Sequence, residues 1–402
     1  MKDNHPLVSI IISAYNHENC VADSIDSVLD QNYENFELHI VDDGSTDSTN
    51  SIIEKTIAEY VPDNRIHYYH YPENSGFSWT DEVYSMLKGK YICAISADDA
   101  IKKDKIEKQV YCLENNCKEY HGCFSHVEIR SKDRTTEEFM DKLFNSTVEN
   151  DQYRLLHRLF VYGNFLNAPS MMFRRDVFME LGGYNWGYRQ LQDYALWLKV
   201  LCRYNIMVIP EKLTIYNVLE NSLSTLNAFS RTLLVSETEA ILHDTLLNMS
   251  DEVFIKTFCD EIDPAWGNTS TDVKCQKVLL SLTGKITKFT DVGVRLYYAF
   301  SRDRLFNQCL FTRYGYSYSK MHKLIYENSS FNALVNGVKP SISVDECIRY
   351  LNELLDVVDG KSDKEITSLH IMAFHRICKE NDGFQENFIK VLDGLHRCGK
   401  LF

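Results

Sequence analysis

Two adjacent carboxylates, Asp98 and Asp99, end an apolar run of strand length at residues 91–97. A run that is apolar throughout is typical of a strand buried on both faces of a parallel sheet, and open α/β sheets bind ligands just beyond the carboxyl ends of their strands. Carboxylate oxygens at that place suit a hard divalent cation that carries a diphosphate. An Asp-Asp turn that only caps the following helix would leave the same local pattern.

Two earlier strand-like runs also end in polar residues. Residues 8–13 are followed by Tyr15 and residues 36–41 by Asp43. Because the carboxyl ends of parallel strands meet at one edge of a sheet, these side chains and Asp99 are expected to line a common edge. Such a convergence is difficult to explain by packing, so the sequence favours a nucleotide site there.

The segments between these runs have helical periodicity. A helix fits residues 18–31, a second carries apolar residues between 52 and 60, and a third strand fits 66–71. The resulting β-α-β-α-β order predicts a mostly parallel sheet with right-handed crossovers. Farther along, residues 103–115 predict a helix, residues 123–129 a strand, and the polar stretch 132–150 a loop or a short exposed helix.

The phosphates of a nucleotide would need a cation or side chains here. The first strand is not followed by G-x-G-x-x-G, and the chain contains no G-x-x-x-x-G-K-[ST]. A glycine cradle for phosphate is therefore excluded, and the carboxylates gain weight as metal ligands.

A second cluster of interest ends in an acidic helix start. A short helix is predicted over 174–181, closed by the glycines at 182 and 183, and a strongly apolar helix follows over 190–200. Asp193 lies in the first turn of that helix. It can serve the helix dipole alone, or it can act as a general base, which must be ionised and must reach a hydroxyl.

Composition sets the broad class. The 402 residues are too many for one ordinary core, and 44% hydrophobic with 25% charged residues is typical of a globular protein. The net charge of -14 argues against nucleic acid as a partner. No apolar run has the length of a membrane span and the polar start is not a signal peptide, so a cytoplasmic location is expected. The scattered cysteines predict reduced thiols.

The second half of the chain is expected to be mainly α-helical. Helical periodicity is found at 231–249, 271–282, 344–358 and 365–378. We therefore predict two domains, an α/β domain over 1–218 and a helical domain over 219–402. The aromatic and basic segment 292–300 predicts either the edge of a core helix or a peripheral contact with a membrane. Self-association through the helical domain is a further expectation.

Several motifs, taken together, resemble the family 2 glycosyltransferases of the bacterial type, which have the Rossmann-like GT-A fold. The resemblance covers roughly residues 6–218. The matching segments are VSIIISAYN at 8–16, SVLDQNY at 27–33, FELHIVDDGSTD at 36–47, Asn74-x-Gly76, GKYICAISADD at 89–99, GGY at 182–184 and QDYALW at 192–197.

This resemblance implies an inverting transfer of a sugar from a nucleotide diphosphate donor, UDP being the expected nucleotide. It implies that Asp99 binds Mn²⁺ or Mg²⁺ and that Asp193 is the catalytic base. The remaining candidates would contact the donor: Ser13 and Tyr15 at the base, Asp43 at the base edge, Asp98 near the ribose or sugar, and Asn16 and Gly76. The implied acceptor is a growing glycan on a polysaccharide, a lipid carrier or a protein, which suits the inner face of a membrane.

Two departures from the family pattern qualify these expectations. Ser96 stands where many relatives carry a further acid, and Thr80 to Glu82 stand where an Arg-Asn pair is usual. Arg65 and Lys103 are candidates for the missing positive contact with the donor. The departures also leave an alternative function open, a non-catalytic subunit that binds nucleotide-sugar or glycan and supports assembly.

Overall fold

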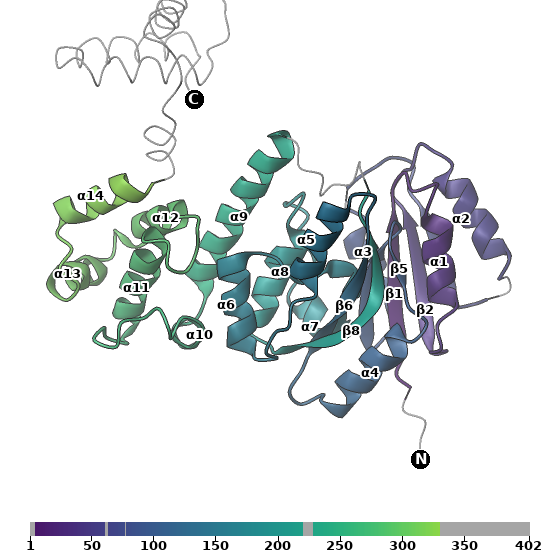
Figure 1. The fold of residues 1–402 in the computed structure, drawn as a ribbon, viewed down its shortest axis with the longest axis horizontal. Coiled ribbons are helices and arrows are strands. Elements are labelled where there is room, and N and C mark those ends of the chain that lie inside the picture. The colour runs from purple at the N-terminus through teal and green to yellow at the C-terminus, as the bar shows by residue number, and fades with distance from the viewer. Residues whose placement is uncertain (1–4, 61–62, 77, 220–227, 330–402) are drawn as a thin grey trace, which may run out of the picture. The chain divides into compact units, whose positions relative to one another are not determined.

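The structure is a computed structural model that describes residues 5–60, 63–76, 78–219 and 228–329. Its described residues up to His322 belong to one compact unit. Figure 1 shows a twisted sheet in the first half of the chain and a series of helices after it. The helices predicted at 344–358 and 365–378 lie outside the described residues.

Eight strands form one mixed sheet in the order β3-β2-β1-β4-β7-β6-β8-β5. Strand β1 pairs in parallel with β2 and β4, β2 with β3, and β6 with β8, whereas β7 and β5 join in antiparallel. The predicted α/β class with a mostly parallel sheet is confirmed. The strands are β1 (Val8–Ala14), β2 (Phe36–Asp42), β3 (Ile66–His70), β4 (Tyr91–Ser96), β5 (Ala100–Ile101), β6 (Gly122–Arg130), β7 (Met172–Arg174) and β8 (Ile206–Asn217).

Helices alternate with these strands along the chain. The prediction for 132–150 is resolved in favour of a helix, α5, which begins after Asp133 because that side chain accepts hydrogen bonds from two backbone N–H groups of the first turn. The helices of this half are α1 (Val21–Leu29), α2 (Thr49–Ala58), α3 (Thr80–Met86), α4 (Lys105–Asn115), α5 (Arg134–Phe144), α6 (Gln152–Tyr162), α7 (Arg175–Glu180) and α8 (Gln192–Leu201).

The two faces of the sheet are covered by different helices. On one face, alternate residues of β1, β2 and β4 pack with apolar residues of α1, α2 and α4 in a single core cluster. On the other face, Trp197 of α8 stacks on Phe173 and meets Phe124 edge to face, with ring centroids 5.4 and 4.8 Å apart. Because side chains alternate across a strand, this two-sided burial explains why the run of β4 is apolar on both of its faces.

Helices dominate the described chain after β8, as predicted. They are α9 (Ala228–Asn248), α10 (Asp251–Thr257), α11 (Ser270–Leu282), α12 (Asp291–Phe300), α13 (Arg304–Thr312) and α14 (Tyr318–Asn328). The segment at 292–300 is α12, whose Val292, Leu296 and Tyr297 are buried. Gly293 allows the close approach of α11, since a Cβ there would lie 2.5 Å from the backbone nitrogen of Leu282.

Helix α9 contacts the sheet domain through a buried carboxylate. Glu237 is 6% exposed and accepts hydrogen bonds from the backbone N–H groups of Arg189, Gln190 and Leu191, at 2.7, 3.0 and 3.0 Å. These residues lead directly into α8. Backbone N–H groups at the start of a helix have no carbonyl partner within that helix and need another acceptor. Glu237 therefore fixes the start of the helix that carries Asp193. The domain boundary at 218 stays a prediction.

We expect Glu237→Ala to lower the free energy of unfolding by about 2–4 kcal/mol, because three backbone donors lose a charged acceptor in a buried place. Chemical denaturation followed by circular dichroism measures this change. Glu252→Ala is the matched control, since Glu252 forms an exposed ion pair with Lys256 within α10 and such pairs contribute below about 1 kcal/mol. Equal losses in the two variants would contradict the assignment.

Candidate active site

Three parallel strands bring their carboxyl ends together at one edge of the sheet. In the register of the sheet, Ser13 of β1 lies beside Ser96 of β4, and Ala14 lies beside Asp42 of β2. Two backbone hydrogen bonds continue the pairing past the strands, from Asp43 N to Ala14 O at 2.9 Å and from Ala97 N to Ser13 O at 3.0 Å. The structure thus places the residues after β1, β2 and β4 side by side, as the sequence predicts.

The end of β1 combines an exposed aromatic ring with a fixed turn. Tyr15 is 43% exposed, whereas Asn16 adopts a left-handed conformation with a φ of 56°. The Asn16 side-chain oxygen accepts a hydrogen bond from Thr46 N at 2.8 Å, and Asn16 N donates to Ser45 Oγ at 2.9 Å. Asn16 therefore connects β1 to the loop after β2, and the Tyr15 ring remains accessible for stacking.

The two aspartates at the end of β2 have different environments. Asp42 is fully buried and bonds to Ser45 N and to the His70 ring. Asp43 accepts hydrogen bonds at one oxygen from the backbone and the hydroxyl of Ser75, at 3.1 and 2.9 Å. Gly44 follows with a φ of +71°, so close to Glu73 that a Cβ would lie 2.3 Å from its backbone. The loop that carries Gly76 is thereby attached to the end of β2.

Asp98 and Asp99 form the short connection between β4 and β5. Asp99 is 2% exposed, and one of its oxygens accepts a hydrogen bond from Asn217 N at 2.9 Å. The Asn217 side chain donates to Asp98 O at 2.6 Å. Burial and the neighbouring Asp98 raise the pKa of Asp99 well above its usual value, although the bond from Asn217 opposes this. The last residue of β8 thus holds both acids in place.

The helix that follows β1 begins inside this acidic region. Burial is the main cause that raises the pKa of Cys20 to about 11, and the charges of Asp98, Asp99 and Asp47 add to it. The loops after β2 and β4 both contact this region, since Glu18 N donates to Asp47 Oδ2 at 3.2 Å and Ser24 Oγ of α1 donates to Ser96 O at 3.5 Å. A cation would be attracted to this region of concentrated negative charge.

A feature of Asp98 itself indicates that the acids after β4 can bind a divalent cation. One carboxylate oxygen of Asp98, Oδ1, is buried and has no hydrogen-bond partner among the described residues. A buried carboxylate oxygen without a donor is unfavourable unless a cation or water compensates it. Hard cations such as Mg²⁺ and Mn²⁺ prefer carboxylate oxygens. Asp98 and Asp99 can therefore hold such an ion.

Asp193 lies in the first turn of α8 and is partly buried. Its two oxygens accept hydrogen bonds from Tyr194 N at 2.7 Å and from the Asn164 side chain at 2.8 Å. Burial raises the pKa of Asp193 to about 6, and the two donors limit that rise. A carboxylate that titrates close to neutral pH suits a general base. These hydrogen bonds do not connect Asp193 to the strand ends, so its place opposite the donor stays a prediction.

Sequence reasoning missed several residues that position these acids. Asn217 and Ser75 hold Asp99 and Asp43 from distant parts of the chain, and Asn164 does so for Asp193.

The two candidates for a positive contact with the donor lie elsewhere. Arg65 precedes β3, at the amino edge of the sheet, where it pairs with Asp63. Lys103 pairs with Asp30, the residue after α1.

No helix in the described ranges is both long enough and apolar enough to cross a membrane.

Comparison with known proteins identifies the family. The model of glycosyl transferase family 2 matches residues 9–182. A putative teichuronic acid biosynthesis glycosyltransferase of Bacillus subtilis (strain 168) is 30% identical over 222 residues, which are 54% of this chain and 82% of the relative. An uncharacterized glycosyltransferase of Haemophilus influenzae is 33% identical over 158 residues, 38% of this chain and 61% of the relative.

Two solved structures are more distant in sequence. Staphylococcus aureus TarS 1-349 in complex with UDP-GlcNAc has a TM-score of 0.49 at 15% identity and covers 77% of this chain and 93% of its own. The mannosyltransferase PcManGT of Pyrobaculum calidifontis, in complex with GDP-Man and Mn²⁺, has a TM-score of 0.49 at 16% identity and covers 84% and 89%.

The family match and the relative covered over most of its length agree with the motifs at the ends of β1, β2 and β4. The sheet with acids at its carboxyl edge is the GT-A-type domain that the resemblance predicted. This chain belongs to family 2 of the glycosyltransferases.

Proposed function

We propose that this glycosyltransferase is an inverting enzyme that transfers a sugar from a nucleoside diphosphate-sugar, with UDP as the nucleotide, to a hydroxyl of a growing glycan. The observation that carries the proposal is the meeting of three strand ends that bear Tyr15, Asp43 and the pair Asp98–Asp99. Together they offer a ring for a base, an acceptor for the base edge and oxygens for a cation at the place where α/β sheets bind nucleotides.

The donor would lie along this edge with its base at the end of β1. The exposed ring of Tyr15 can stack on the base, and Ser13, which is half-buried near the end of β1, can bond to the base or ribose. Asp43 uses one oxygen for Ser75, which leaves the other for an N–H of the base edge, the group that uracil offers. Gly76, on the loop attached to Gly44, adds backbone close to the donor. Asn16 would act indirectly, through the turn that it fixes.

The diphosphate would lie at Asp98 and Asp99. A bound Mn²⁺ or Mg²⁺ would neutralise the negative charge that develops on the departing diphosphate. Asp99, fixed by Asn217, is the proposed ligand, and Asp98 contributes its unpartnered oxygen or contacts the sugar. Ser96 supplies no carboxylate in this place, so these two acids carry the electrostatic attraction for the ion.

Asp193 would act on the acceptor. Its carboxylate removes the proton of the acceptor hydroxyl while that oxygen forms a bond to C1 of the sugar, and the bond from C1 to the phosphate oxygen breaks on the opposite face. This displacement inverts the configuration at C1. A relative concerned with teichuronic acid biosynthesis supports a polysaccharide as the acceptor, and a lipid-linked or protein-bound glycan is tested in the same assay.

Asp193→Asn tests the base. We expect transfer to fall by about 10²–10⁴-fold, as removal of a general base generally does, with UDP affinity nearly unchanged. Release of UDP in the presence of acceptor, together with calorimetry of UDP binding, measures both. Asp176→Asn, on an exposed carboxylate paired with Arg174, is the matched control. Turnover at the wild-type rate in Asp193→Asn would refute the assignment.

The pH dependence gives a second test of the base. Because Asp193 must be ionised and has a pKa of about 6, transfer should decline as the pH falls through 6. In Asn164→Ala the carboxylate loses a donor that stabilises its ionised form, so this decline should shift to higher pH by roughly one unit. Asn116→Ala, which removes an amide bonded to the Cys112 carbonyl, should leave the profile unchanged. An unshifted profile in Asn164→Ala would count against Asp193.

Asp99→Asn tests the metal site by two readouts. Donor binding should lose its dependence on Mn²⁺, since the proposed ligand becomes neutral. Without metal, the variant should melt about 2–5 °C above the wild type at pH 8, because it removes a buried charge. The pKa of Asp99 is raised on folding, so its ionisation destabilises the wild type increasingly as the pH rises, and the gain should vanish near pH 4.

Two outcomes of these experiments would point elsewhere. Metal-dependent donor binding that survives in Asp99→Asn would contradict the metal site. Donor binding by the wild type without hydrolysis or transfer to any acceptor would instead indicate the non-catalytic subunit.

A further inference from the structure

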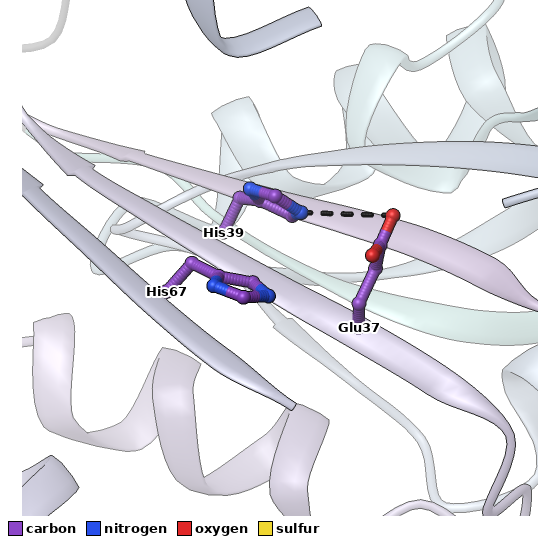
Figure 2. Close-up of side chains that lie close together, drawn as sticks. All are labelled: Glu37, His39 and His67. Atoms are coloured by element: carbon purple, nitrogen blue, oxygen red, sulfur yellow. Dashed lines mark ion pairs between the residues drawn. The ribbon is translucent and has the colours of Figure 1, made fainter. Parts of the chain in front are cut away.

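A cluster of two imidazoles and a carboxylate lies on the face of the sheet, separate from the strand ends. Glu37 and His39 are two residues apart on β2 and therefore point to the same side. His67 of β3 is the register partner of His39. Figure 2 shows the two rings next to each other, with His39 directed at Glu37. One ligand atom from each residue lies within 4.8 Å of the other two.

The His39 ring is buried but incompletely paired. It is 2% exposed, its Nδ1 lies 3.1 Å from the Tyr69 hydroxyl, and its Nε2 has no hydrogen-bond partner among the described residues. Nε2 instead lies 3.6 Å from Oε1 of Glu37. That distance exceeds an ordinary hydrogen bond, so a buried polar atom is directed at a carboxylate without bonding to it.

Neither tautomer of a neutral His39 resolves this arrangement. If Nδ1 donates to the Tyr69 oxygen, the lone pair of Nε2 faces a carboxylate oxygen, which is repulsive. If the Tyr69 hydroxyl donates to Nδ1, the proton on Nε2 finds its acceptor too distant. A cation bound by Nε2 would satisfy that nitrogen, and the neighbouring carboxylate of Glu37 would balance its charge. The ring of His67, whose centroid is 4.7 Å from that of His39, offers a third donor atom.

The surroundings orient the cluster in the way that ligands of a metal are usually oriented. Oε1 of Glu37 accepts hydrogen bonds from Ser9 Oγ and from Lys88 N, both at 2.6 Å, and Gly89 N donates to Ser9 Oγ at 2.8 Å. Tyr69 holds the far nitrogen of His39. Hydrogen bonds to the nitrogen that faces away from a metal fix the tautomer and ring position of metal-bound histidines. Hydrogen bonds from the turn at residues 88–89 would by themselves explain why Glu37 is buried here. They would not explain the two histidines beside it.

We propose that Glu37, His39 and His67 bind a transition-metal cation of the zinc class. Imidazole and carboxylate groups suit Zn²⁺, whose bonds to nitrogen and oxygen are about 2.0–2.2 Å long. Ligand atoms around such an ion are therefore roughly 3.4 Å apart. The 3.6 Å between His39 Nε2 and Glu37 Oε1 approaches this value, and one ring nitrogen of His67 lies within 4.8 Å of the other two ligand atoms. Water would complete the coordination. The ion would join β2 to the edge strand β3, independently of the proposed chemistry at Asp99.

Co²⁺, whose visible absorption reports tetrahedral coordination, tests the site. The full chain is stripped of metal, supplied with excess Mg²⁺ to occupy the oxygen ligands at Asp98–Asp99, and titrated with Co²⁺ and then Zn²⁺. We expect one equivalent of tetrahedral Co²⁺ that Zn²⁺ displaces, and at least ~10-fold weaker binding in His67→Asn. His67 is partly exposed, so this variant is expected to fold. His126→Asn, on a partly buried histidine of β6, should bind as the wild type does.

Thermal melting supplies a readout that does not depend on colour. Saturating Zn²⁺ should raise the melting temperature of the wild type and of His126→Asn by ~3–6 °C, and that of His67→Asn by much less. The proposal is overturned if the wild type takes up no tetrahedral Co²⁺, or if His67→Asn binds and melts like the wild type. The first result would show that no such ion binds, and the second that the ion binds without His67.

Discussion

The parallel pairing of β1 with β2 on one side and β4 on the other is the constraint on which the remaining features depend. Side by side in one direction, the three strands must end at one edge, and the chain leaves each of them through a polar turn. Tyr15, Asp43 and Asp99 are therefore neighbours although up to 84 residues separate them in the sequence. The apolar strands are buried on both faces, so this edge is the place where the sheet can present chemistry.

Much of this edge could be predicted from the sequence because apolar runs and the polar residues after them are local signals. The residues that hold the acids in place could not be predicted in this way. Asn217 reaches Asp99 from the end of β8, 118 residues away, and nothing in its neighbourhood distinguishes it from an ordinary turn residue. The two-residue strand β5 is too short for a periodic pattern, and it lies just before the helix predicted over 103–115. Antiparallel β7 has only three residues and was missed in the same way.

The acids proposed for catalysis are kept in unfavourable surroundings. Burial raises the pKa of both Asp99 and Asp193. These carboxyl groups therefore ionise less readily in the folded protein than they would when exposed to water. Their partners reduce this cost without removing it: one backbone donor for Asp99, one backbone and one side-chain donor for Asp193. Such local instability is common where a protein holds groups ready for a ligand, because the ligand supplies the missing interaction.

Glu237 has a consequence for how such a chain can change over generations. A single carboxylate of α9 completes the hydrogen bonding of the turn that leads into α8. Exchange of the helical half between related genes would therefore disturb the active-site half unless the incoming segment brought an equivalent acceptor. The two halves are therefore expected to be inherited together. A recombination boundary immediately after β8 would separate three N–H donors from the carboxylate that accepts their hydrogen bonds.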